Sequence, residues 1–187
     1  MAEPKLARIA ADKEFLPTKD IALVTLDEIK IKTADEYEAE PEIVEGEKVE
    51  LIVNGDLVAS DEAPTIIKGY NLKFKDNAIR PKLMKALQGG THEAGDSSTK
   101  GQKYIGPNVG ALKPVTINEV AVYTKIYAEN GFTGEYIKTT YTNCVGDLVN
   151  FAFKAGEFFA SEFTVKSRPS GGTATYTMQV VDSLPGE

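Results

Sequence analysis

The clearest pattern in the sequence lies near its C-terminal end, where apolar and polar residues alternate on both sides of a Pro-Ser-Gly-Gly segment at 169–172. Strand side chains alternate between two faces, so this pattern is typical of two strands that each have one apolar face. A turn at the glycines would place Val165 opposite Tyr176 and Phe163 opposite Met178, with both apolar rows on one side. The sequence therefore predicts that these two strands pair as a β-hairpin.

Similar alternation elsewhere predicts a second hairpin and several further strands. Asn54-Gly55 lies between two apolar runs, and this dipeptide is a strong signal for a two-residue hairpin turn. Residues 20–32 alternate with a change of parity, which indicates a strand with a bulge or with two buried faces. The other predicted strands cover residues 65–77, 115–127, 135–143, 147–155 and 158–167.

One segment has the period of a helix instead. Ile79, Leu83 and Leu87 recur at four-residue steps, which predicts a short amphipathic helix over residues 78–88. The expected start and end signals are Asp76 or Asn77 as the N-cap, Pro81 in the first turn and Gly89 after the last turn.

The spacing of these elements indicates the fold class. Strands about ten residues apart, separated by turn signals and without a βαβ rhythm, are typical of an antiparallel β-sandwich or barrel-like fold. We expect an N-terminal arm at residues 1–19 and a single β-sandwich domain at 20–187. That domain includes a long Gly-rich loop at 89–114, and loops of this length are usually functional or disordered.

Charge narrows the classes of function. The 187-residue chain has a formal net charge of −7, whereas a general nucleic-acid binder would need a basic surface. The carboxylate-rich stretch 33–50 is interpreted as a solvated loop, because it lacks the ligand spacing of an EF-hand. The N-terminal residues do not resemble a signal peptide, and no apolar run approaches the length of a membrane helix. We expect a protein made in a cytoplasm and not inserted in a membrane.

The candidate chemistry is sparse. His92 has no metal-ligating or catalytic partners at a recognisable spacing, and Cys144 is predicted to be a packed thiol. The segment GDSSTKGQ departs from the phosphate-loop pattern. No catalytic, cofactor-binding or metal-binding residues are therefore predicted, and we expect a protein that is not an enzyme, although a pair of carboxylates brought together by folding stays an open alternative. Cross-strand packing or a sugar- or protein-binding face would explain four tyrosines, Tyr123, Tyr127, Tyr136 and Tyr141.

The order of parts resembles a known family. The strand GYNLKFKDN leads into the helical segment AIRPKLMKALQGGT, and a β-rich half ends in EFFASEFTVKSRPSGGTATYTMQVVDSLP. This order resembles the major tail (tail tube) proteins of tailed bacteriophages and the tubes of phage-like bacteriocins. The similarity covers about residues 47–185, with Gly89-Gly90 ending the helix and Asp-Ser-Leu-Pro at 182–185 ending the last strand.

The resemblance implies a structural subunit of a phage or phage-like tail, in which six copies form a ring and stacked rings form a conduit for DNA. It implies partners such as tape-measure, terminator or sheath proteins, with DNA passing through without specific binding. It also implies that the long loop and the terminal arms join the rings. An alternative reading of the residues is a small β-sandwich binding module, of the carbohydrate-binding or adhesin type, that uses the tyrosines.

Overall fold

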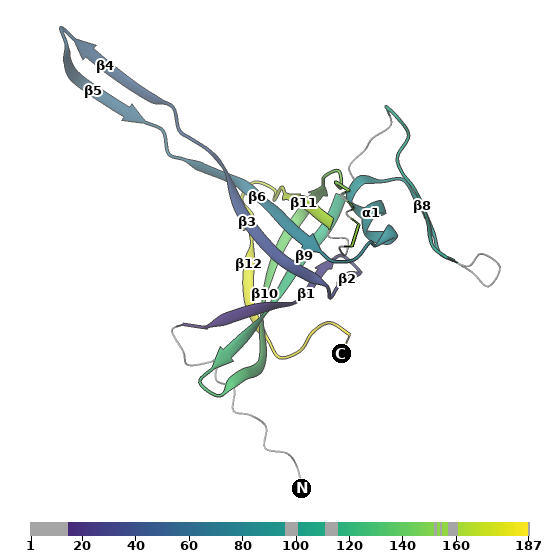
Figure 1. Ribbon diagram of the computed structural model, residues 1–187. Coiled ribbons are helices and arrows are strands. Elements are labelled where there is room, and N and C mark those ends of the chain that lie inside the picture. Colours follow the sequence, from purple (N-terminus) through teal and green to yellow (C-terminus); the bar gives the residue numbers. More distant parts are fainter. Residues whose placement is uncertain are drawn as a thin grey trace.

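The computed structural model describes residues 15–95, 101–110, 116–151, 153, 155–156 and 161–186. Within these residues the chain is mostly antiparallel β with one short helix, as predicted, and its sheet does not close into a barrel (Figure 1). The elements are β1 (Thr18–Leu26), β2 (Ile29–Ile31), β3 (Ala34–Val44), β4 (Lys48–Val53), β5 (Asp56–Glu62), β6 (Ile66–Asp76), α1 (Pro81–Gln88), β7 (Thr91–Glu93), β8 (Lys103–Ile105), β9 (Thr116–Ala128), β10 (Gly131–Gly146), β11 (Ser161–Ser167) and β12 (Thr177–Val181).

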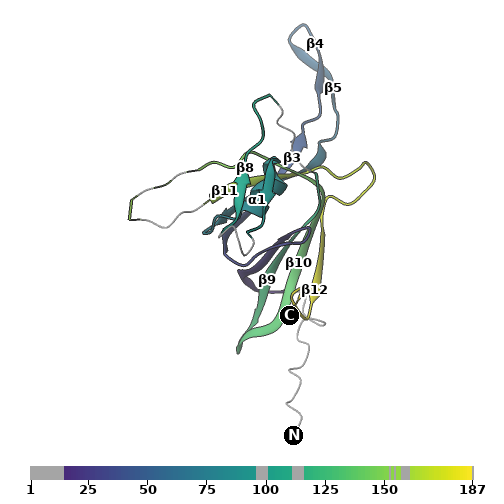
Figure 2. The same cartoon turned by 90° about the vertical axis from the view of Figure 1, so that its right-hand side faces the viewer.

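The main sheet has the order β2-β1-β9-β10-β11-β6-β3, and β12 joins it by pairing with β10. Strand β10 has 16 residues, so the edge that does not face β9 can accept two partners: β12 along its middle and β11 at its end. The sheet curves strongly, so that β3, β6 and β11 cross over β1, β9 and β10 (Figures 1 and 2). Two strand pairs, β4–β5 and β7–β8, lie outside the main sheet.

The predicted C-terminal hairpin is wrong, because β11 and β12 do not pair with each other. Both edges of β11 are occupied, one by β6 with Phe163 opposite Phe74, and the other by the end of β10. Strand β12 pairs with β10 instead, where Met178 lies opposite Thr139. The segment with Gly171 therefore connects strands on different parts of the sheet.

Three other predictions need correction. Residues 33–50 are not a solvated loop, since most of them form strand β3, which pairs with β6 over its whole length. Residues 20–32 form two strands joined by a turn at Asp27, and the expected bulge is present where β1 pairs with β9. Of the strand predicted at 147–155, the described residues contribute only an isolated bridge between Asn150 and Glu162.

Other predicted elements are confirmed. The Asn54-Gly55 turn joins β4 to β5, and both residues have the positive φ angles, 54° and 90°, that a two-residue hairpin turn requires. Strands β6 and β9 match the predicted ranges to within one residue. Residues 1–14 of the predicted arm lie outside the described residues, and β1 begins at Thr18, so the division into arm and domain stays a prediction.

The hydrophobic core lies between the two halves of the curved sheet. Its buried side chains come from β1, β2, β6, β9, β10, β11 and the helix. Phe74 stacks on Phe163 with ring centroids 5.1 Å apart, and Tyr37 of β3 stacks on Phe74 at 5.4 Å. The hydroxyl groups of Tyr37 and Tyr141 are 2.5 Å apart, so a hydrogen bond joins the two halves of the sheet.

A smaller cluster covers the opposite face of β1 and β9. It consists of Leu23, Ala121, Tyr123 and Leu184, with Val181 packed against it. The chain after β12 returns across this face, and the Lys30 ammonium donates a hydrogen bond to the Pro185 carbonyl at 2.7 Å. The residues after β12 thus pack on this face of the sheet.

Helix α1 closes one end of the core. Leu83 and Leu87 are buried as predicted, Pro81 is the first helical residue, and the Gly89 N–H caps the Lys85 carbonyl. The predicted N-cap is wrong, because the cap position is Arg80 and no side chain caps the helix. Asp76 is fully buried one turn earlier, where its carboxylate accepts hydrogen bonds from Arg80 and Thr33. It therefore anchors the helix to β6 and not through the helix N–H groups.

Candidate assembly surfaces

The edge strand β3 forms one margin of the main sheet. Its outward side chains are carboxylates at every second position, and they form ion pairs with Lys73 and Lys75 of β6 and with Arg168. Lys73 lies 2.8 Å from Glu40, and this hydrogen bond is the main cause that raises the pKa of Lys73. Pro41 has no N–H to donate at this edge. Charged side chains and proline are devices by which proteins discourage an edge strand from pairing with another chain.

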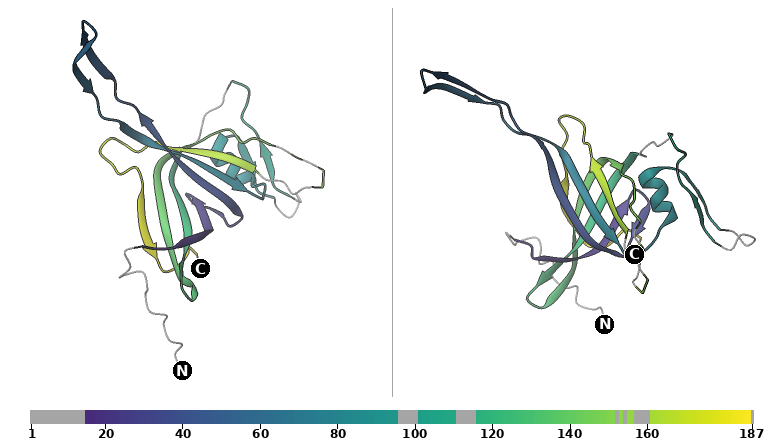
Figure 3. Two further views of the ribbon diagram at one scale, coloured as in Figure 1. Left: turned by 60° about the vertical axis from the view of Figure 1, so that its left-hand side comes forward. Right: turned by 45° about the horizontal axis from the view of Figure 1, so that its top comes forward.

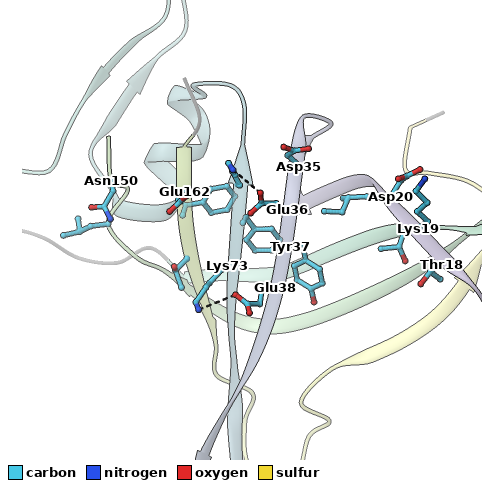
Figure 4. Close-up of a pocket in the computed structure, with 17 residues that line it drawn as sticks. Thr18, Lys19, Asp20, Asp35, Glu36, Tyr37, Glu38, Lys73, Asn150 and Glu162 are labelled. Carbon is cyan, nitrogen blue, oxygen red and sulfur yellow. Dashed lines mark hydrogen bonds and ion pairs between the residues drawn. The ribbon is translucent and has the colours of Figure 1, made fainter. Parts of the chain in front are cut away.

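A polar hollow of about 980 Å³ lies beside this margin, lined by the start of β1 and by β3, β6 and β11. Figure 4 shows Asp35, Glu36 and Glu38 on β3, with Thr18 and Asp20 on the other side. The Lys75 ammonium lies 3.0 Å from Glu36, and Lys73 lies 3.5 Å from Glu38, so these acidic groups are partly neutralised across strands. This arrangement is that of a solvated charged surface.

Strand β12 forms a second margin with a different character. Its sequence, Thr-Met-Gln-Val-Val, contains no charge and no proline. Met178 is 62% exposed and Val180 is 40% exposed, and both lie on the same face of the strand. In the part of the chain that the structure describes, β12 pairs only with β10, so its other edge has unpaired backbone groups. An uncharged apolar edge of this kind is suited to pairing with another chain.

The third surface is the β4–β5 hairpin, which projects away from the body of the molecule (Figures 1 and 3). Every residue of both strands is exposed. Six large aliphatic side chains are among them, although an isolated two-stranded hairpin is at best marginally stable in water. Contiguous exposed apolar residues mark sites of interaction. They are Val49, Leu51, Ile52, Val53, Leu57 and Val58.

The residues singled out from the sequence do not form one site. His92 lies in β7, with its Nε2 atom buried and without a hydrogen-bond partner among the described residues. Cys144 is fully buried in β10, and burial raises the pKa of its thiol to about 12, which fits the predicted packed thiol. The two side chains come from different elements, and no group of three or more His, Cys, Asp or Glu in the described residues is placed to hold a metal ion.

The four tyrosines are also divided between places. Tyr141 is buried in the main core, whereas Tyr123 is buried in the cluster on the opposite face of the sheet. Tyr127 and Tyr136 each pack against Phe132, with ring centroids 6.0 and 5.3 Å away. The tyrosines therefore do not present the shared exposed face that a binding module would need.

The long loop is partly structured. Strands β7 and β8 form a short hairpin beside the helix, where the Tyr104 hydroxyl donates to the Gly89 carbonyl at 2.8 Å and accepts from Gln88 at 3.0 Å. Residues 96–100 and 111–115 lie outside the described residues. The loop's role between rings stays a prediction. No helix in the described part of the chain has the length and apolar character needed to cross a membrane.

Comparison with models of known protein families and with curated protein sequences finds no match. Among solved structures, the chain is similar to the tube-terminating cap of the anti-feeding prophage, with 12% identity and a TM-score of 0.44 over 93% of this chain and 99% of that one. It is similar to a chain of the PVC extracellular contractile injection system, from the sheath–tube complex in the extended state (11% identity, TM-score 0.41, 91% and 95% covered).

A chain of the PVC sheath/tube terminator in the extended state gives comparable values, with 11% identity and a TM-score of 0.43 over 90% of this chain and 99% of that one.

Proposed function

We propose that the protein is a structural, non-enzymatic subunit of the tail tube of a phage or phage-like particle, and that copies of it join through their sheet margins. The observation that carries this proposal is the uncharged free edge of β12 with exposed Met178 and Val180. A monomer with such an edge risks irregular aggregation. Pairing the edge with a different margin of the next copy removes it and, when the rotation closes, produces a ring.

The wider assembly follows the family resemblance. Stacked rings, hexameric in this proposal, would form the conduit for DNA in the virion tail, assembled in the bacterial host cytoplasm. The loop at 89–114 would act as a clasp between rings. Tape-measure, terminator or sheath proteins would be the other partners. A net charge of −7 supports a conduit that repels phosphate, so that DNA passes without specific binding. In this proposal the protein is not inserted in a membrane.

Two substitutions on β12 test the proposal. The variant M178K/V180K places charges on the free edge, where both side chains are exposed, so we expect the monomer to fold normally but rings and tubes to disappear. Negative-stain microscopy and sedimentation velocity of concentrated protein measure assembly, and thermal unfolding checks the fold. The control I66K/I67K adds the same charge at two exposed apolar positions of β6, outside both β12 and the loop at 89–114, and it should still form rings.

Two results would contradict the proposal. If the unmodified protein stays monomeric at every concentration and salt, it is not a self-assembling tube subunit. If M178K/V180K forms rings as well as the unmodified protein does, the β12 edge is not the joining surface.

A further inference from the structure

Strands β1, β9, β10 and β12 are neighbours in the main sheet, and each one pairs antiparallel with the next. Strand β12 therefore runs antiparallel to β1, at the opposite end of this four-stranded unit. A copy generated by rotation about an axis along the strands keeps these directions. The β12 edge of one copy then meets the β1 edge of the next copy in the antiparallel sense that the sheet already has.

The other margins of the main sheet are less suitable partners for β12. In the order of the sheet, β2 and β3 both run in the same direction as β12, because β2 is antiparallel to β1 and three antiparallel steps separate β3 from β10. A joint to either strand would be parallel, and parallel pairing is slightly less stable per residue. Strand β3 also has its carboxylates and Pro41, which discourage pairing with another chain.

Part of the β1 edge is free to receive a strand. On the side away from β9, β2 pairs only with the last three residues of β1. In the described part of the chain, no strand pairs with residues 18–23 on that side. This segment borders the polar hollow, where Figure 4 shows Thr18, Lys19 and Asp20. Six residues of β1 are therefore available to the five residues of β12.

The two faces of β12 also match those of β1. The pairing registers define rows of side chains that cross the four strands, and the row of Val180 ends at Ile21, which packs against the main core. The row of Gln179 ends at Leu23, which belongs to the smaller cluster on the opposite face. Met178 and Val180 therefore lie on the core-facing side, and a joined β1 would continue that side beside them. Their exposed apolar surface would then be covered, which favours association.

Strand β2 restricts the register of such a joint. Across the four strands of one copy, Thr177 and Met178 lie level with the part of β1 that β2 covers. In the next copy that part of the edge is already occupied, so β12 has to slide by two residues toward the start of β1. A slide of two residues keeps every side chain on its own face, whereas a slide of one residue would exchange the faces.

We propose that β12 of one copy pairs antiparallel with residues 18–23 of β1 in the next copy, and that β2 is the stop that sets their register. The slide of two residues places Met178 beside Ile21 on the core-facing side and Gln179 beside Lys19 on the other side. The inference rests on the proposed self-assembly and names the strand that receives the β12 edge. It also explains why an open edge of β1 and an open edge of β12 occur in the same sheet.

Disulfide crosslinking between two full-length variants tests this register. K19C and Q179C replace exposed side chains, and directly opposite positions of an antiparallel pair bring their Cβ atoms close enough for a disulfide. The variants are mixed under mild oxidation, and mass spectrometry identifies the linked peptides. We expect the K19C–Q179C product to exceed both homodimers at least several-fold. The native Cys144 does not compete, because it is fully buried and its pKa is raised to about 12.

A matched control uses an exposed residue of the other margin. E40C on β3, mixed with Q179C, should give no more product than random pairing. Predominance of the E40C–Q179C product would overturn the proposal in favour of β3 as the receiving strand. Predominance of the Q179C homodimer would overturn it in favour of a two-fold β12–β12 pair. Absence of the K19C–Q179C product from assembled protein would overturn it as well.

Charge substitutions give an independent readout of the same contact. With Gln179 beside Lys19, the variant Q179E should assemble at a roughly two- to fivefold lower concentration than Q179K, because opposite charges across strands attract and like charges repel. In the K19E background this order should reverse, which separates the local contact from the change in net charge. Sedimentation velocity measures the assembly of all four variants. The same order in both backgrounds would contradict the contact.

The outcomes separate this inference from the proposed function. Rings or tubes without the K19C–Q179C crosslink would refute the joint to β1 and leave the tube proposal standing, with another margin receiving β12. A specific crosslink in open chains that never close into rings would support the joint and refute the tube proposal. Protein that neither assembles nor crosslinks at high concentration would refute both.

Discussion

Strands β3 and β12 both lie at margins of the same sheet, yet they differ in the charge and the polarity of their exposed side chains. β3 carries a carboxylate at every second position and Pro41, and its inward-facing Tyr37 packs into the core. β12 has neither charge nor proline, and its apolar side chains Met178 and Val180 are exposed. The comparison shows that β3 carries the features that discourage pairing with another chain, whereas β12 lacks them.

The largest expected effect on stability comes from removing a side chain of β3 that packs into the core, compared with removing an exposed side chain of β12. Tyr37→Ala removes the stacking on Phe74 and the hydrogen bond to Tyr141, and we expect it to lower the free energy of unfolding by about 2–4 kcal/mol. Met178→Ala on β12 should change that free energy by at most about 0.5 kcal/mol, because the side chain is mostly exposed. Urea unfolding measures both.

Assembly should respond in the reverse order. At a temperature where both variants are folded, Met178→Ala should weaken ring formation more than Tyr37→Ala does. If Met178→Ala unfolds the monomer, or if Tyr37→Ala leaves its stability unchanged, the distinction between the two margins fails.

The sequence predicts strand faces better than strand partners. Period two identifies which side chains share a face, and it correctly indicated β6, β9 and the Asn54-Gly55 hairpin. It carries no information on which edge a strand meets. Phe163 therefore shares the predicted apolar face, but its neighbour is Phe74 of β6 and not Met178 of β12.

The acidic stretch at 33–50 also shows that the partner of a strand cannot be inferred from the local sequence. The carboxylates at 35–42 indicated a loop, although Tyr37 and Ala39 already alternated with them. The strand forms because Tyr37 and Ala39 pack against the core and the backbone pairs with β6, which is distant in sequence, while lysines of β6 lie beside the carboxylates. The exposed hairpin, in contrast, has a signal in the local sequence. Apolar residues at both odd and even positions flank Asn54-Gly55, so two strands paired only with each other leave apolar side chains exposed.

A smaller effect is expected from the hydrogen bond between Tyr37 and Tyr141. Tyr37→Phe should lower the free energy of unfolding by about 1–2 kcal/mol at neutral pH, because the Tyr141 hydroxyl loses its hydrogen-bond partner. Burial raises the pKa of Tyr37 above its ordinary value, with the hydrogen bond to Tyr141 as the next cause. The neutral phenol is thus the form that the fold favours.

The pH dependence follows from this sign. The contribution of Tyr37 is present below the ordinary tyrosine pKa of about 10 and is lost as the pH rises above it. Urea unfolding between pH 8 and 11 should show a decline in stability that is shallower for Tyr37→Phe than for the unmodified protein. Cys144, with its raised pKa, contributes equally to both proteins and cancels in the comparison. Parallel pH profiles would contradict this role of Tyr37.

The smallest effect on stability, and the sharpest test of the comparison, comes from the charges of β3. The ion pairs of Lys73 with Glu38 and Glu40 lie on the surface, where such pairs contribute little to stability. We therefore expect the variant E36Q/E38Q/E40Q/E42Q to unfold at nearly the same temperature as the unmodified protein. The variant should nevertheless aggregate more readily, since it lacks the charges that discourage pairing at this edge.

Light scattering and negative-stain microscopy should then detect irregular aggregates beside the regular rings. The matched lysine variant M178K/V180K should do the opposite, removing regular rings without adding aggregates. Well-ordered rings and no aggregates from the quadruple variant would show that the carboxylates of β3 do not protect this edge. The difference between the β3 and β12 margins would then depend only on Pro41 and on the packing of Tyr37.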